Sequence, residues 1–318
     1  MTETDSQING GVADAAPGNW VDRLAPAWSR PYLRLSRADR PIGTWLLLIP
    51  CWWGLLLAMG HTGTASWHDA WIGLGCALGA WLMRGAGCTW NDITDREFDG
   101  AVERTKSRPI PSGQVTARQA LGWAVLQSLL AFLVLLTFHP VAIALGIGSL
   151  ALVAIYPFAK RFTWWPQVFL GLAFNWGALL AWAAHTGSLS LAPLALYAAG
   201  IAWTLFYDTI YAHQDKEDDA LIGVKSTARL FGADTHRWLR WFLVATLTLF
   251  LLAIVLAAPG NILTITIAIC GVWAMGWHLA WQLRSLDPDD SATCLRLFRS
   301  NRDAGLIPAA LLALSLLA

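Results

Sequence analysis

The sequence predicts an all-α integral membrane protein that crosses the bilayer nine times. Apolar residues make up 56% of the 318 residues and charged residues only 14%, whereas a typical soluble protein carries about 25% charged residues. The stretches 119–159, 162–207 and 241–283 contain no Asp, Glu, Lys or Arg, and each can hold two spanning helices of about 20 residues. This composition excludes a soluble enzyme and a disordered scaffold. The net charge of +1 gives no reason to expect a nucleic acid as a partner.

Hydropathy divides the chain into nine candidate helices. In order, they cover residues 42–60, 69–90, 117–137, 140–159, 163–184, 189–211, 238–258, 261–283 and 303–318. Each long uncharged stretch is broken by residues that favour turns, namely His139-Pro140, His185 to Ser188, and Pro259 to Asn261. Charged loops follow the second, fourth, sixth and eighth helices, and the uncharged loop 61–68 separates the first two.

The positions of lysine and arginine test these nine helices independently. Of the 22 basic residues, 21 lie before the first helix or in the loops after the second, fourth, sixth and eighth. The opposite loops contain none, and the remaining residue, Arg84, lies within the second helix. Because basic loops stay on the cytoplasmic side, we expect a cytoplasmic N-terminus and a C-terminus outside.

The chain is expected to have one membrane domain, residues 31–318, after a polar tail and approach segment, residues 1–30. We expect the tail to be disordered. It has neither the apolar core of a signal peptide nor the Arg- and Ser-rich composition of a transit peptide. These features favour a bacterial inner membrane as the location.

Two of the basic loops also concentrate acidic residues where a helix ends. If the helices continue, the residues of each set share one face. The first set is Asp92, Asp95 and Asp99, directly after Asn91, and the second is Asp208, Tyr211, Asp215 and Asp219.

Aligned carboxylates repel one another, so they destabilise the fold unless a cation compensates. Carboxylate oxygens suit Mg²⁺, which also shares the phosphates of a substrate. The alternative is that these acids are solvated and offset nearby arginines. We accept that explanation for Glu97, Glu103, Glu217 and Asp218, and favour metal binding for the two aligned sets.

Each acidic segment is followed by a basic, turn-rich segment, 104–113 in the first case and 223–229 in the second. The segment 156–161 adds Lys160 and Arg161 on the same side. Cations beside metal-binding acids suit a metal–diphosphate substrate. Topology and contact with anionic lipids also explain arginines here, more convincingly for Arg118 and Arg237 than for the loop residues Arg104 and Arg108.

These segments together resemble the UbiA family of membrane prenyltransferases, and among its members those that act on 4-hydroxybenzoate. The matching patterns are N-D-x-x-D-x-x-x-D from Asn91, R-T-x-x-R-P-x-P-S-G from Arg104, Y-P-F-x-K-R from Tyr156, Y-D-T-x-Y-A-x-x-D-x-x-x-D from Tyr207, R-P-I-G-T from Arg40 and F-x-x-N-x-x-x-G from Phe298. The resemblance runs from about residue 33 to the C-terminus. It implies nine transmembrane helices around a central cavity, arranged as in terpenoid synthases.

The resemblance also implies an activity, in which Mg²⁺ bridges the aspartate motifs to a polyprenyl diphosphate. The prenyl group is transferred to the ring carbon ortho to the hydroxyl of 4-hydroxybenzoate, a step of ubiquinone biosynthesis. The implied catalytic residues are Asp95, Asp99, Asp215 and Asp219, which also hold the metal with Asn91 and Asp92. The implied diphosphate residues are Arg104, Arg108, Tyr156, Lys160 and Arg161. The implied residues for the aromatic acceptor are Arg40, Arg161, Asp208 and Tyr211.

Two alternatives stay open at this point. A related prenyltransferase would use haem, a chlorophyll precursor, homogentisate or a naphthoate as acceptor. A secondary transporter is a second alternative, because internal repeats and charges within the membrane are common in that class. We rank it lower because the acids lie at one membrane face rather than at the midplane. The sequence decides neither the prenyl chain length nor the oligomeric state.

Overall fold

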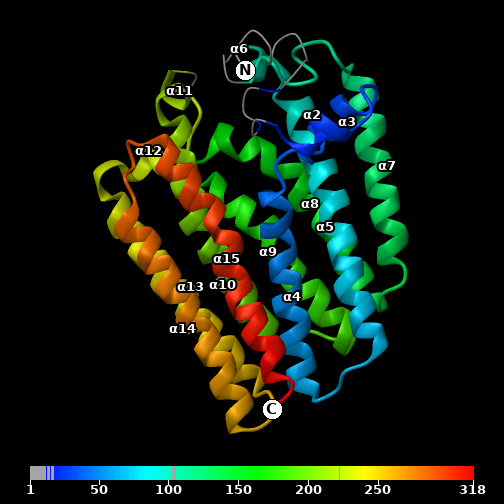
Figure 1. Ribbon diagram of the computed structural model, residues 1–318, viewed down its shortest axis with the longest axis vertical. Helices are drawn as coiled ribbons and strands as arrows, with labels where there is room; N and C mark the ends of the chain where they lie inside the picture. The colour runs from blue at the N-terminus through cyan, green and yellow to red at the C-terminus, as the bar shows by residue number, and fades with distance from the viewer. Residues whose placement is uncertain (1–11, 13–14, 16–17, 102–104, 222) are drawn as a thin grey trace. The chain divides into compact units, whose positions relative to one another are not determined.

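Figure 1 shows the protein as a computed structural model. It describes residues 12, 15, 18–101, 105–221 and 223–318. Within these residues the secondary structure is helical, without any β-strand. The all-α prediction is therefore confirmed. The predicted disordered tail lies mostly outside the described residues.

Nine of the helices in the described ranges contain 19 residues or more. They are α4 (Ile42–Thr62), α5 (Trp67–Thr94), α7 (Ala117–Leu135), α8 (Pro140–Phe162), α9 (Pro166–Thr186), α10 (Leu191–Ala212), α13 (Thr235–Ala257), α14 (Ile262–Ser285) and α15 (Ser291–Ser315). Seven candidate membrane spans are long and apolar enough to cross a bilayer, and α5 and α15 are not among them. The count of nine membrane crossings therefore stays a prediction.

The last long helix, α15, begins well before its predicted start near residue 303. The Asp290 carboxylate caps it by accepting hydrogen bonds from the backbone N–H groups of Ala292 and Thr293, at 3.1 and 3.3 Å. The first half of α15 carries Arg296, Arg299 and Arg302. A hydropathy search cannot detect this half because it is too polar.

The chain divides into two compact units. The first combines residues 1–44 with 78–134. It contains the short helices α2 (Trp20–Leu24), α3 (Arg30–Leu35) and α6 (Arg96–Ala101), the second half of α5, and nearly all of α7. A small core of Leu35, Val115 and Ala120 joins α3 to the start of α7. The predicted domain limits at residues 30 and 31 stay a prediction.

The second unit combines residues 45–77 with 135–318. Here α10 packs against α9 and α13, and α14 packs against α15, as the labelled ribbons show (Figure 1). Trp53 is fully buried between Trp203 and Phe250, with ring centroids 5.0 and 4.9 Å away. Gly54 lets α4 approach the backbone of α9 closely, because a Cβ added there would collide with the Ala178 carbonyl.

Candidate active site

The first aspartate motif lies where α5 ends and α6 begins. The α5 helix ends at Thr94, but helical hydrogen bonds continue across the break. The Asp95 N–H donates to Asn91 O at 2.9 Å and the Asp99 N–H to Asp95 O at 2.8 Å. Asp92, Asp95 and Asp99 are buried, with exposed fractions of 0%, 1% and 8%. Three carboxylates from one helical path are thus withdrawn from water.

Two arginines lie against these carboxylates. Arg37 Nη2 is 2.6 Å from Asp92 Oδ1. Arg108 Nη1 is 2.8 Å from Asp99 Oδ2 and 3.5 Å from Asp92 Oδ1. Arg108 therefore bridges two members of the motif, and the predicted diphosphate residue is already beside the predicted metal residues. Arg104, predicted for the same role, lies outside the described residues.

The chemistry of these donors fits a divalent cation. Burial raises the pKa of Asp99; Arg108 opposes this shift, and the carboxylates of Asp92 and Asp95 add to it. Asp92 Oδ2 is buried without a hydrogen-bond partner. Among the described residues no three His, Cys, Asp or Glu side chains converge to form a metal cage. Mg²⁺ does not need one, since it keeps several waters and shares substrate phosphates.

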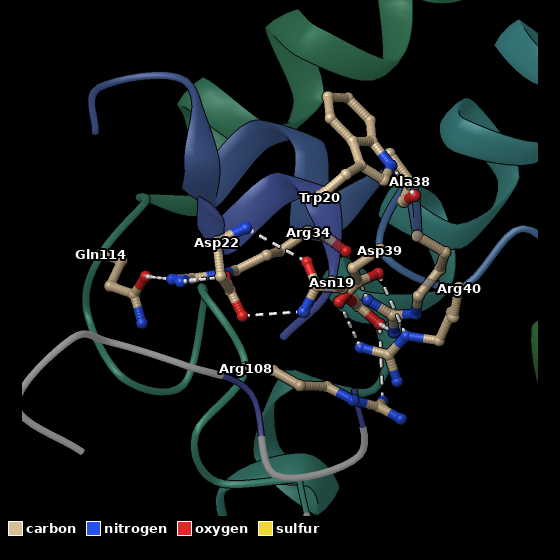
Figure 2. A network of polar contacts seen from close by, with 11 residues as sticks. Asn19, Trp20, Asp22, Arg34, Ala38, Asp39, Arg40, Arg108 and Gln114 are labelled. Carbon is tan, nitrogen blue, oxygen red and sulfur yellow. Dashed lines mark hydrogen bonds and ion pairs between the residues drawn. The ribbon is translucent and has the colours of Figure 1, made fainter. Parts of the chain in front are cut away.

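The approach segment before α4 forms a polar scaffold beside this motif. Figure 2 shows Arg34 reaching Asp22 on one side and Gln114 on the other. Arg34 is buried, and its guanidinium is 2.7 Å from Asp22 Oδ1 and 3.3 Å from Gln114 Oε1. The Trp20 indole donates to Ala38 O at 2.8 Å. These contacts connect α2 and α3 to the loop that carries Arg108.

Two further cations belong to this unit. Arg40 lies in the approach segment, where its guanidinium pairs with the buried Asp39 carboxylate at 3.1 Å (Figure 2). Arg84 lies on α5 two turns before Asn91, so both point along one face of the helix. Its guanidinium packs so closely on Gly43 that an added Cβ would collide with it.

The second aspartate motif lies in the other unit. Asp208 and Tyr211 belong to α10, Asp215 ends the 3₁₀ turn η1 (His213–Asp215), and Asp219 lies in α11 (Lys216–Leu221). The expected helix does continue, but the 3₁₀ turn tightens it between Tyr211 and Asp215, which changes the angular spacing along the shared face. The Tyr211 ring packs on Phe298, with centroids 4.4 Å apart.

The basic segment after Asp219 folds back onto it. The Val224 N–H donates to Asp219 O at 2.9 Å, and Arg229 Nη1 donates to the same oxygen at 3.1 Å. Arg229 also donates to Val224 O. The loop then enters α12 (Thr227–Phe231), which Ser226 caps. The two hydrogen bonds to Asp219 O fix the backbone of Asp219.

The end of α8 carries Tyr156, Lys160 and Arg161, as the sequence predicts. The Lys225 N–H donates to Lys160 O at 3.2 Å, so the end of α8 is joined to the basic segment of the second motif. Arg161 is exposed, with its guanidinium 5.1 Å from the centre of the Phe158 ring. The backbone at Lys160 therefore lies beside the loop that follows Asp219.

Sequence reasoning missed Arg34, Arg37 and Gln114. The two arginines served only as topology markers, because their spacing to the aspartates spans dozens of residues. The left-handed position of Arg37 is visible only in the structure, since hydropathy does not predict the short helix α3 that it follows. Nothing in the local pattern singles out Gln114.

These observations define a helical membrane protein with acidic and basic motifs at the helix ends. The chain belongs to the UbiA prenyltransferase family, which matches residues 47–303. It is 49% identical over 288 residues to the 4-hydroxybenzoate polyprenyltransferase, mitochondrial, of Rattus norvegicus, covering 90% of this chain and 75% of the rat protein. The protein of the same name from Arabidopsis thaliana is 45% identical over 304 residues, covering 95% and 72%.

Solved structures agree on the fold. A UbiA homolog from Archaeoglobus fulgidus bound to GPP and Mg²⁺ aligns with a TM-score of 0.67 at 21% identity, covering 91% of this chain and 100% of that one. A UbiA homolog from Aeropyrum pernix K1, without ligand, aligns with a TM-score of 0.65 at 21% identity, covering 84% and 97%. The predicted UbiA-type helix arrangement is thereby confirmed.

The predicted bacterial location is wrong. The relatives from rat, Arabidopsis thaliana and Caenorhabditis elegans are mitochondrial proteins, which points to a mitochondrial membrane. Both membranes present a hydrocarbon core to the chain, so hydropathy does not distinguish them. The absence of a transit-like segment carries no weight either, because the rat protein extends beyond the part that matches. The predicted cytoplasmic N-terminus and outside C-terminus were defined for a bacterial membrane, so they are withdrawn together with that location.

Proposed function

We propose that this chain is a Mg²⁺-dependent 4-hydroxybenzoate polyprenyltransferase. It transfers a polyprenyl group from polyprenyl diphosphate to the ring carbon ortho to the hydroxyl of 4-hydroxybenzoate. The product is an intermediate of ubiquinone biosynthesis. The reaction takes place within a membrane, where the prenyl tail stays among apolar helices.

The observation that carries this proposal is the identity of 45–49% to proteins of that name over nine-tenths or more of the chain. A related acceptor, such as haem or homogentisate, finds no support among these relatives. The transporter alternative is likewise unsupported. Both acidic motifs and all three basic segments lie within residues 47–303, which match the family.

The metal residues in this proposal come from both motifs. Asn91, Asp95 and Asp99 of the first motif would hold Mg²⁺, as would Asp215 and Asp219 of the second. Support comes from the buried, mutually repelling carboxylates of the first motif and from their oxygen chemistry. When bound, Mg²⁺ would neutralise charge that develops on the departing diphosphate.

The diphosphate residues supply the remaining positive charge. Arg108 is held between Asp92 and Asp99, so it can turn from a carboxylate to a phosphate oxygen over a short distance. Lys160 and Arg161, with the Tyr156 hydroxyl, would contact the diphosphate from the end of α8, and Arg104 from the first basic loop. Fixed cations at the leaving group stabilise the transition state without reorganising at the moment of reaction.

The 4-hydroxybenzoate acceptor needs a cation to bind its carboxylate, and its ring must be shielded from water. Arg40, fixed by Asp39, is our choice for the carboxylate, with Arg161 as the other candidate. Asp208 and Tyr211 are proposed to line the acceptor position. As the C1–oxygen bond breaks, the prenyl C1 becomes an allylic, carbocation-like centre that the ortho carbon attacks. A motif carboxylate or the released diphosphate then takes the ring proton, and the apolar surroundings exclude water that would quench the cation.

A turnover assay tests this function. The purified chain is given 4-hydroxybenzoate, Mg²⁺ and polyprenyl diphosphates of several lengths, and the assay is repeated with a chelator. We expect prenylated product only with metal, and a loss of about 100-fold or more in kcat for Asp95→Ala and Asp215→Ala. Glu97→Gln, which changes an exposed acid of the same segment, is the matched control and should keep full activity. Full metal-dependent turnover by either alanine variant would refute the metal assignment.

A further inference from the structure

Arg37 occupies a backbone position that normally belongs to glycine. The α3 helix ends in two capping hydrogen bonds, from Ala38 N–H to Leu33 O and from Arg37 N–H to Arg34 O, both 3.0 Å long. This pattern ends a helix with one residue in the left-handed region, usually glycine. Arg37 has a φ of 55°, which a side chain makes unfavourable. The fold keeps an arginine where glycine would be less strained.

The Arg37 side chain is fixed at both of its terminal nitrogens. It is buried, with 7% of its surface exposed. Nη2 donates to Asp92 Oδ1 at 2.6 Å, and Nη1 donates to Arg34 O at 3.1 Å. A guanidinium presents its donors in a rigid fork, so these two bonds set its orientation. The orientation of Asp92 is set with it.

Asp92 passes this constraint on to the rest of the first aspartate motif. It sits on the last turn of α5, next to Asn91 and one turn before Asp95. The oxygen that accepts from Arg37 also faces Arg108, whose Nη1 is bonded to Asp99. A continuous chain of ionic contacts therefore runs from Arg37 through Asp92 and Arg108 to Asp99.

We propose that Arg37 is a positioning residue for metal binding at the first aspartate motif. It acts through Asp92, holding the end of α5 and the Arg108 bridge in the arrangement that receives the cation. This inference rests on the proposed function, because it assumes that the motif binds a divalent metal. Arg34 supports this arrangement, because its guanidinium contacts Asp22 and Gln114 (Figure 2) and its backbone carbonyl accepts the hydrogen bond from Arg37 Nη1.

The variant Arg37→Gly removes the guanidinium while keeping the backbone. Glycine adopts the left-handed conformation without strain, so the end of α3 should fold at least as well as in the parent. We expect the half-saturating Mn²⁺ concentration to rise about 10-fold or more. It is measured by electron paramagnetic resonance on the purified full chain without substrates. Arg37→Lys keeps the charge but not the forked donor geometry, so its half-saturating Mn²⁺ concentration should lie between those of the parent and of Arg37→Gly.

A double variant separates action through Asp92 from an independent effect. Arg37→Gly and Asp92→Ala each remove one partner of the same contact, so the double variant should bind Mn²⁺ no more weakly than whichever single variant binds it less tightly. If the two losses multiply, Arg37 does not act through Asp92, and the proposal is overturned.

The charge of Arg37 alone predicts the opposite effect on Mn²⁺ affinity. Removing a cation beside three carboxylates should tighten metal binding if Arg37 acts only through its field. Tighter or unchanged Mn²⁺ binding by Arg37→Gly would therefore overturn the proposal. Arg96→Ala is the matched control, because Arg96 is an exposed arginine of the same segment, 3.8 Å from Glu97; it should change Mn²⁺ affinity by less than about twofold.

The test also stands apart from the proposed function. If the parent chain prenylates 4-hydroxybenzoate and Arg37→Gly binds Mn²⁺ normally, only the positioning role fails. If the parent binds Mn²⁺ yet transfers no prenyl group, only the proposed function fails. A KM for Mg²⁺ that rises in Arg37→Gly, with kcat at saturating metal near the parent value, would support the positioning role in the active enzyme.

Discussion

Single residues of the first aspartate motif combine burial with charge in a way that only function explains. Asp92, Asp95 and Asp99 are nearly inaccessible, and burying a charge is costly unless it is paired. Arg37 pairs with Asp92, and Arg108 pairs with Asp99. Burial and the neighbouring carboxylates of Asp92 and Asp95 still raise the pKa of Asp99, and this cost of holding the carboxylates together is the physical basis for expecting a metal here.

The variant Asp99→Asn tests the free-energy cost of burying the Asp99 carboxylate. Burial raises the pKa of Asp99, with Arg108 opposing the shift and Asp92 and Asp95 adding to it. The folded chain therefore holds this proton to a higher pH than the unfolded chain. The stabilisation is fully present below the unfolded pKa and is lost as the pH rises through the folded pKa. At neutral pH without metal, Asp99→Asn should thus unfold at the same or a higher temperature than the parent, and the difference should vanish in acid.

Added Mg²⁺ should reverse the order of the two unfolding temperatures, so that the parent becomes more stable than Asp99→Asn. A ligand present at ten times its Kd stabilises the state that binds it by about 1.4 kcal/mol, and the amide should lose most of that gain. Thermal unfolding in detergent, with and without Mg²⁺ across the acid-to-neutral range, measures both effects. A variant that is clearly less stable than the parent at neutral pH without metal would contradict the prediction.

At the scale of helices, the sequence predicts position well and length less well. Long uncharged runs place α8, α9, α13 and α14 within a few residues, because the hydrocarbon core demands continuous apolar helix. The start of α15 and the short helix α3 escape this reasoning, since they are polar and the fold stabilises them by capping and side-chain contacts. The chain of contacts from Arg37 to Asp99 escapes it for the same reason. It depends on tertiary geometry between segments far apart in sequence.

Close packing between helices gives a prediction at this scale. In Gly54→Ala the new Cβ would collide with the backbone carbonyl of Ala178 on α9, which cannot move aside as a flexible side chain would. Overpacking of this kind costs about 1–3 kcal/mol, so we expect a lower unfolding temperature in detergent. Gly79→Ala is the matched control, because nothing lies within 4 Å of its added Cβ and alanine favours a helix interior. Equal unfolding temperatures for the two variants would argue against tight contact between α4 and α9.

For the whole molecule, composition and charge distribution identify the class of protein but not its cellular location. The scarcity of charged residues and the one-sided basic loops follow from bilayer physics. The same physics acts in a bacterial and in a mitochondrial membrane, so the bacterial prediction failed while the membrane prediction held. The motifs added what hydropathy lacks, because their chemistry depends on residue type at fixed spacing.

The one-sided distribution of basic loops predicts a membrane topology that chemical labelling can test. Single cysteines are introduced at Ser112 and Asp289, exposed positions in two of the basic loops, and at Thr64 and Ser188, exposed positions in two of the opposite loops. In sealed vesicles a membrane-impermeant thiol reagent should label one pair and spare the other, which should react only after permeabilisation. The five native cysteines are unpaired, so they are replaced beforehand and the cysteine-free parent gives the background. Charged loops cross the membrane reluctantly, so labelling that mixed the two pairs would mean that one of the predicted crossings between these positions does not span the bilayer. Among these crossings, α5 is the one that is not among the candidate membrane spans.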